Sequence, residues 1–257
     1  MEFSRRSLLL GSLAIGAALA PLAGCAAAAR GKTRVYVIGT IHANHRSSSR
    51  YSLAVLEAAI RKAAPDVILT EIPPDRIGQA LSSFAETGEI DEPRTQVFPE
   101  YTDVVFPLSR EIPFRIVGTA GWTREIADNR SAALKRIGSD PARAQQWHEY
   151  EAAQLNYMEQ VAGRSDDPKF IHTDAFDQIV EASRAPYQNY FDEDLGPGGW
   201  TQINAAHTAL INQALDAISG QGLTAVITFG SAHKYMILRS LAQRSDIAIE
   251  NTAKLFE

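Results

Sequence analysis

The sequence predicts an α/β fold, with a mostly parallel central sheet flanked by helices and a helical insertion in the middle of the chain. Three observations support this prediction. Short β-rich apolar runs end at a glycine or a glutamate, segments of helical periodicity separate them, and strands at both ends of the chain flank a mostly helical middle.

The first predicted strand covers residues 34–38 and ends at Gly39. Apolar residues then recur at helical spacing between Leu53 and Ala63, and Pro65 ends that helix. Residues 67–69 form the second strand. A strand, a helix and a strand in this order indicate parallel strands joined by a right-handed crossover.

The rest of the chain continues the alternation, with a third strand at 114–117, a fourth at 225–229 and a last one near 247–249. Residues 78–112 are less regular, and residues 186–199 are rich in Tyr, Asp, Gly and Pro, which predicts a loop. Helices are expected at 122–137, from Asp140-Pro141 onward, at 174–184, at 203–218 and at 234–244. We therefore expect one α/β domain over residues 34–257, with a helical insertion at about 120–200.

The N-terminal segment has the pattern of an export signal. Arg5 and Arg6 precede an apolar stretch that ends in small residues, as in a signal peptide, and the adjacent arginines resemble a twin-arginine signal. Leu22-Ala-Gly-Cys25 resembles the bacterial lipobox, in which the cysteine receives a lipid. We expect a signal peptide over 1–24, a lipidated tether over 25–33, and an exported lipoprotein anchored to the membrane and facing the periplasm or the cell exterior. The alternative is an uncleaved anchor helix with an incidental cysteine.

Composition and missing motifs argue against several classes of protein. Cys25 is the only cysteine, so no internal disulfide can form. The net charge of −5 argues against nucleic acid as a partner, because such binding needs a basic face. No Gly-x-Ser-x-Gly motif is present, which argues against a standard serine hydrolase.

Two Gly-x-x-His motifs carry the candidate chemistry. Gly39-Thr-Ile-His42 follows the first strand, and Gly230-Ser-Ala-His233 follows the fourth. Glu71 ends the second strand, and in open parallel sheets ligands bind at the carboxyl edge of the strands. Two imidazoles and a carboxylate suit a divalent metal, and they equally suit acid–base catalysis without a metal. Each residue alone has an ordinary alternative: a loop histidine, or for the glutamate a helix cap or ion-pair partner.

Two further histidines lie near these motifs in the sequence. His45 is a candidate third nitrogen ligand, although its polar loop favours a solvated surface position. His207 falls on the apolar stripe of the helix at 203–218, which favours a hydrogen-bonded core histidine, with lining of a pocket as the second interpretation. His148 and His172 have no informative context.

Three segments together resemble the TraB/GumN family: Val37-Ile-Gly-Thr-Ile-His42, Pro65-Asp-Val-Ile-Leu-Thr-Glu71 and Ile227-Thr-Phe-Gly-Ser-Ala-His233. Its wider superfamily includes the Tiki proteases, the erythromycin esterases and a group of haem-binding lipoproteins. Members share two Gly-x-x-His motifs and a glutamate after the second strand. The resemblance covers the two ends of the chain. One departure is that relatives often carry an Arg-Asn pair on the helix before the last motif, where this chain has Ile203-Asn204 or Ile211-Asn212.

The resemblance implies a cell-envelope hydrolase of peptide or ester bonds, acting on a small-molecule or peptide substrate, with His42, Glu71 and His233 as catalytic residues or as ligands of a divalent metal. Arg130 or Arg184 is a candidate to replace the missing arginine in space. The alternative is a non-catalytic lipoprotein that holds haem or a metal. A third possibility is an inactive structural relative.

Overall fold

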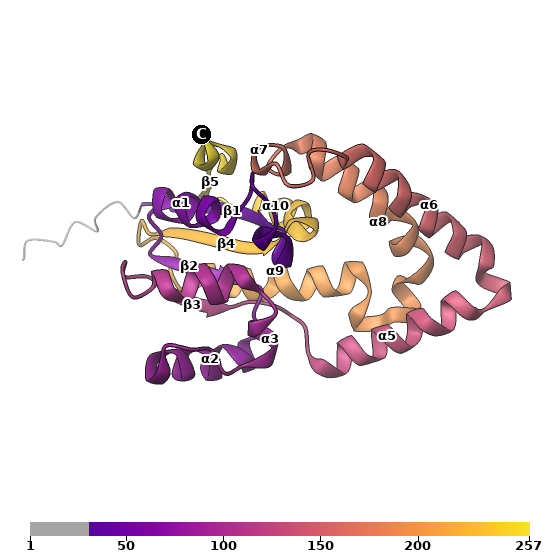
Figure 1. Cartoon of the computed structure of the whole chain (residues 1–257), viewed down its shortest axis with the longest axis horizontal. Helices are drawn as coiled ribbons and strands as arrows, with labels where there is room; N and C mark the ends of the chain where they lie inside the picture. The colour runs from indigo at the N-terminus through magenta and orange to yellow at the C-terminus, as the bar shows by residue number, and fades with distance from the viewer. Residues whose placement is uncertain (1–30) are drawn as a thin grey trace, which may run out of the picture.

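A computed structural model describes residues 31–257 and contains a five-stranded parallel sheet in the order β3-β2-β4-β1-β5 (Figure 1). The strands are β1 (Thr33–Thr40), β2 (Val67–Thr70), β3 (Arg115–Gly118), β4 (Thr224–Gly230) and β5 (Ile247–Ile249). The predicted α/β class with a parallel sheet is therefore confirmed. The signal peptide, Cys25 and most of the predicted tether lie outside the described residues.

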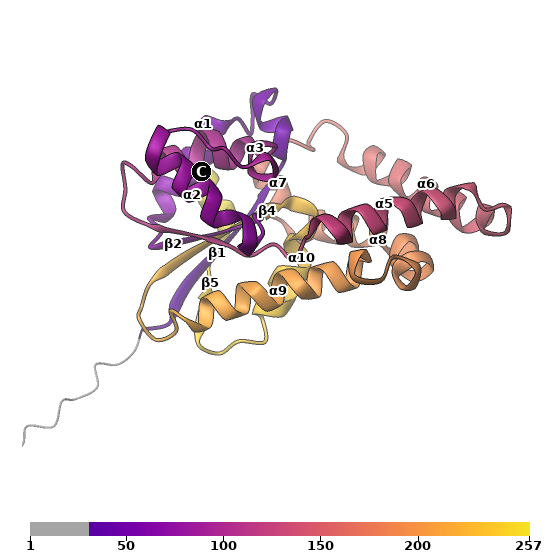
Figure 2. The ribbon, with the colours of Figure 1, turned by 90° about the horizontal axis from the view of Figure 1, so that it is seen from below.

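The central strands are apolar on both faces because helices cover both faces of the sheet. In β1, Val35 and Val37 belong to one buried cluster, whereas Tyr36 and Ile38 belong to the other, as the two-residue period of a strand requires. On one side lie α1 (Leu53–Ala63), α2 (Pro74–Thr87) and α4 (Phe106–Leu108). On the other side lie α9 (Trp200–Asp216) and α10 (Lys234–Leu241), and Figure 2 shows α1 and α2 on the opposite side of the sheet from α9.

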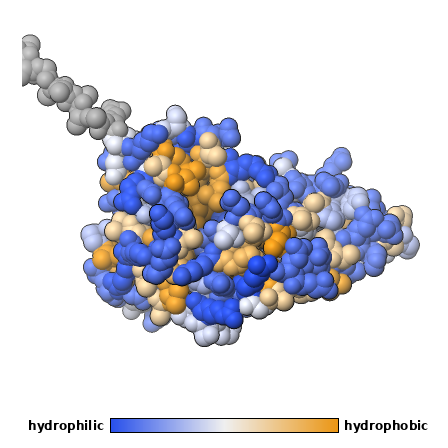
Figure 3. All heavy atoms as spheres, turned by 90° about the horizontal axis from the view of Figure 1, so that it is seen from above, coloured by the Kyte–Doolittle hydropathy of each residue, from blue (hydrophilic) through white to orange (hydrophobic). Residues whose placement is uncertain are grey.

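Between β3 and β4 the chain forms a helical insertion that projects away from the sheet (Figures 1 and 2). It consists of α5 (Arg124–Ser139), α6 (Ala144–Val161), the short α7 (Pro168–Ile171) and α8 (Asp174–Leu195), and it is followed by α9. Aromatic side chains of α6 and α8 hold it together, and the Tyr150 ring lies 5.6 Å from that of Tyr187 and 5.9 Å from that of Phe191. Hydrophilic residues dominate the outer surface of this projection in Figure 3.

The loop predicted for residues 186–199 is wrong over most of its length, because α8 continues through Pro186 to Leu195. Proline removes one backbone donor from the helix, but the buried face goes on at helical spacing through Tyr187, Phe191 and Leu195. Burial of these side chains outweighs the local cost of the proline. A 3-10 turn at Gly196–Gly198 and the single residue Gly199 then connect α8 to α9.

The region 78–112, where the sequence pattern is less regular apart from a short helix expected at Leu81 and Phe84, is largely helical, and α2 contains both residues. After α2 come α3 (Pro93–Gln96) and a single turn of π-helix at Glu100–Val105, which leads into α4. Turns of π-helix are rare and are often found at functional sites. Across residues 31–257, no helix combines the length and apolar character that crossing a bilayer requires.

Candidate active site

The order of the strands brings the three predicted site residues together. β2, β4 and β1 are consecutive neighbours in the sheet, and Glu71, His233 and His42 follow them at the same carboxyl edge. Thr40 pairs with Gly230 and Thr70 with Thr228, so the three strands end almost level with one another.

Glu71 occupies the centre of this group and is buried, with 4% of its surface exposed. Its Oε2 lies 3.9 Å from His42 Nε2, and its Oε1 lies 4.0 Å from His233 Nε2. The backbone N–H of Gly230 donates a hydrogen bond of 2.8 Å to Oε2. The carboxylate is thus held between two imidazoles.

Gly230 has a steric role that explains the second Gly-x-x-His motif. A Cβ atom at this position would lie 2.5 Å from His42 Nε2 and 3.4 Å from Glu71 Oε2. Only glycine lets the end of β4 approach both side chains this closely. The sequence prediction that glycine permits a close approach at the strand end therefore has a concrete basis.

Glu100, a residue that sequence reasoning missed, binds His42 on the side of the ring opposite Glu71. His42 Nδ1 lies 2.6 Å from Glu100 Oε1, which also accepts a hydrogen bond of 2.9 Å from the Thr40 hydroxyl. Glu100 is fully buried in the π-helical turn, and its Oε2 has no partner among the described residues. The backbone of His42 has a φ of 49°, in the left-handed region, and such strained conformations cluster at functional sites.

His233 is oriented by Asn204 of α9. Its Nδ1 lies 2.8 Å from Asn204 Oδ1, and the Asn204 amide nitrogen donates to the Trp200 carbonyl at 2.8 Å. The second bond fixes which end of the amide faces His233. Because an amide oxygen only accepts, Nδ1 of His233 carries the proton. The Trp200 ring stacks on the imidazole at 4.7 Å.

The same reasoning applies to His42, whose Nδ1 donates to a carboxylate. When neutral, each histidine therefore presents an unprotonated Nε2 to Glu71. Three acceptor groups facing one another require a proton, a water molecule or a cation between them. A water hydrogen-bonded to Nε2 and to a carboxylate oxygen at about 2.8 Å fits separations of 3.9 and 4.0 Å.

The environments of the two histidines move their pKa values in opposite directions. Burial lowers the pKa of His42, but the hydrogen bond that His42 donates to Glu100 and the charges of Glu71 and Glu100 outweigh burial and raise it. For His233, burial, followed by the nearby His207 and Arg184, holds the pKa well below its usual range. Burial raises the pKa of Glu71. Such opposed shifts suit one acid and one base.

A pocket of about 780 Å³ opens onto the two histidines. His42, His233, Arg184, Trp200 and Tyr157 line it, together with small and polar residues of the loops that follow β1 and β4. The Arg184 guanidinium stacks on Trp200 at 4.7 Å, and its buried Nε has no hydrogen-bond partner among the described residues. Arg130 donates instead to the Tyr187 hydroxyl at 2.8 Å and does not line the pocket. Of the two arginines considered from the sequence, Arg184 reaches the site.

The donor set partly fits a divalent metal. Two imidazole nitrogens and a carboxylate are suitable ligands, and Glu100 and Asn204 hold the outer nitrogens as second partners of metal ligands commonly do. Ligands of a tetrahedral zinc lie roughly 3.4 Å apart, so Glu71 and the imidazoles would have to close by about half an ångström. Among residues 31–257, no cluster of three or more His, Cys, Asp or Glu side chains already has the spacing of a metal site.

Three of the other histidines have structural roles, whereas His148 is exposed on α6. His45 is buried, accepts the Ile41 N–H at 3.0 Å and uses its other nitrogen on the Tyr51 carbonyl, so the expected surface position is wrong and neither nitrogen is free for a metal. His207 is a core residue, as expected, and accepts the Gly121 N–H at 2.8 Å. His172 accepts the Gly39 N–H at 2.9 Å and so supports the end of β1.

Comparison of the chain with protein-family models, curated proteins and solved structures finds no match. The similarity to the TraB/GumN family therefore remains a resemblance of three short segments. The fold and the site geometry are the basis for a functional proposal.

Proposed function

We propose that this chain is a hydrolase of peptide or ester bonds, exported and anchored to the membrane as a lipoprotein through Cys25. The observation that carries the catalytic part is the position of buried Glu71 between two imidazoles that have opposed pKa shifts and that line a pocket. The export signal and the lipobox in the sequence support the location.

In this proposal, a water molecule is held between Glu71 and His233. Neutral His233 takes a proton from the water through Nε2, and the water oxygen attacks the carbonyl carbon of the substrate. Asn204 keeps the acceptor nitrogen of His233 directed at the water. Burial keeps this histidine unprotonated and ready to act as the base.

His42 acts as the acid. Its raised pKa favours the imidazolium form, which donates a proton to the leaving nitrogen or oxygen when the tetrahedral intermediate collapses. Glu100 stabilises that imidazolium and fixes its ring, as a buried carboxylate does behind other catalytic histidines. Arg184 lines the pocket and supplies a positive charge there that favours the oxyanion or an anionic group of the substrate.

If a divalent metal is held here, His42 Nε2, His233 Nε2 and Glu71 would hold it, and it would supply Lewis-acid activation of water. The haem alternative has weaker support, because both Nε2 atoms face the Glu71 carboxylate. Haem ligation would require one of them to turn into the open pocket.

The test is hydrolysis of ester and peptide panels by the full-length protein in detergent, with metal analysis of protein purified without chelator. We expect turnover on at least one class, and a loss of about 10²-fold or more in Glu71→Gln. Glu57→Gln is the control, because Glu57 is exposed and pairs only with Arg61. Equal turnover by both variants would overturn the assignment. A Soret band on haem titration that His42→Ala removes would instead favour the binding lipoprotein.

A further inference from the structure

A second cavity contains a concentration of arginines that the proposed function does not use. This arginine pocket, of about 350 Å³, is lined by Arg76 of α2, Arg94 of α3 and Arg124 of α5, together with Pro73, Val97 and Trp122. None of its lining residues lines the pocket that contains His42 and His233. The two pockets are neighbours, because Phe98 packs against Arg94 at 5.4 Å and against His42 at 5.0 Å.

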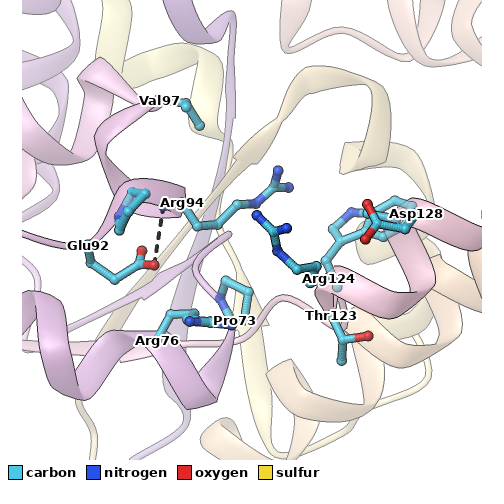
Figure 4. A pocket seen from close by; sticks show the side chains of 11 residues that line it. Pro73, Arg76, Glu92, Arg94, Val97, Thr123, Arg124 and Asp128 are labelled. Carbon is cyan, nitrogen blue, oxygen red and sulfur yellow. Dashed lines mark hydrogen bonds between the residues drawn. The ribbon is translucent and has the colours of Figure 1, made fainter. Parts of the chain in front are cut away.

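Two of these arginines face each other without an acidic partner. Figure 4 shows the guanidinium groups of Arg94 and Arg124 pointing toward one another across the pocket. Among residues 31–257, neither has a carboxylate within 4.0 Å, whereas eight other arginines have one. Arg76 pairs only with its exposed neighbour Asp75, at 3.2 Å.

The carboxylates at the pocket do not neutralise this pair. Glu92 is buried and uses both oxygens to cap α3, where it accepts from the backbone of Arg94 and from the backbone and hydroxyl of Thr95. In Figure 4, Asp128 lies on the far side of Arg124 from Arg94, and the Arg124 side chain extends away from it. Two guanidinium groups that face each other repel, and a negative charge placed between them would be attracted to both.

Two further features favour an anionic ligand with an apolar part. α5 is a helix of 16 residues that begins at the pocket, so the positive end of its dipole adds to the arginine charges. Pro73, Val97 and Trp122 supply apolar surface beside the arginines, and Val97 is 56% exposed. A guanidinium fork matches the two oxygens of a carboxylate or of a phosphate equally well.

We propose that the arginine pocket binds a small organic oxyanion, a phosphate ester or a carboxylate, between Arg94 and Arg124, with the apolar part of the ligand on Trp122. This site does not depend on the proposed hydrolase activity. Its position next to His42 suits either a distal part of a substrate or a separate effector.

The test is calorimetric titration of the full-length protein in nonionic detergent at constant ionic strength, with phenyl phosphate, benzoate and inorganic phosphate as probes. We expect saturable binding of phenyl phosphate or benzoate, and weaker binding of inorganic phosphate, which lacks the ring. Arg94→Gln and Arg124→Gln should each weaken binding by at least about tenfold. Arg94→Lys should lose part of the affinity, because it keeps the charge but not the fork.

The matched control is Arg136→Gln, an exposed arginine in the last turn of the same helix α5, which should bind like the wild type. Thermal unfolding of every variant checks that the fold is retained. The proposal is overturned if no probe saturates, or if neither Arg94→Gln nor Arg124→Gln weakens binding. It is also overturned if Arg184→Gln alone abolishes binding, since the ligand would then lie in the other pocket.

Discussion

Replacing Gly230 by alanine tests the site geometry with a single added carbon. The new Cβ would lie 2.5 Å from His42 Nε2, and ordinary contact begins at 3.4 Å, so the imidazole must move by 3.4 − 2.5, about 0.9 Å. The Gly230 backbone has a φ of −48° and a ψ of 131°, which alanine adopts without strain. The substitution therefore displaces His42 rather than the strand. A misplacement of about 1 Å at a catalytic group costs on the order of 10²-fold in rate.

The assay compares kcat for Gly230→Ala with the wild type on whichever ester or peptide the wild type hydrolyses. Gly78→Ala is the matched control, because a Cβ there meets nothing within 4 Å and Gly78 lies inside α2. The control should keep full activity and gain about 0.5–1 kcal/mol of stability. If Gly230→Ala keeps wild-type kcat while a crystal structure shows His42 displaced, the position of His42 does not matter for the reaction and the reasoning is refuted.

The remaining predictions concern the residues behind the two histidines. Glu100→Gln should reduce kcat by about 10²-fold or more. It should also move the alkaline limb of the pH–rate profile to lower pH, because the pKa of His42 falls when the Glu100 charge is removed. An unchanged profile would contradict this role of Glu100. Asn204→Leu should lower kcat by a similar factor with little change in KM. Asn212→Leu, which removes side-chain bonds to Ser240 and Arg244 instead, should not lower kcat. Burial lowers the pKa of His207 from 6.5 to about 3, so the folded state resists its protonation and stability is lost as the pH falls below 6.5. By urea unfolding, the wild type should lose about 2 kcal/mol more than His207→Gln between pH 6.5 and about pH 5, and equal losses would refute this.

The sequence predicted the parts of the site that lie at strand ends. His42, Glu71 and His233 each follow an apolar run, and parallel strands end at a common edge. The closeness of the three also depends on β2, β4 and β1 being neighbours in the sheet, which only the structure shows. Helical spacing and helix-start signals in turn predicted the insertion, because its helices α5 and α6 fall in segments that carry them.

The residues that orient the histidines were harder to find. Glu100 lies in a π-helical turn within the less regular region 78–112, beyond the short helix expected at Leu81 and Phe84. Its one signal is an acidic residue in the largely apolar segment from Val97 to Phe106, and Asp103 shares that signal. His45 was misjudged because its neighbours are polar, whereas the chain there turns inward and the ring bonds two backbone groups. Tertiary contacts decided both positions.

The most direct measurement of the central claim is kcat/KM for His42→Ala, His233→Ala and the double variant on one hydrolysed substrate. If His233 as base and His42 as acid serve the same hydrolytic reaction, each single change removes most of the activity and the double variant is hardly slower than either. If the losses instead multiply, or if either single variant turns over like the wild type, the two histidines do not work as a unit around Glu71.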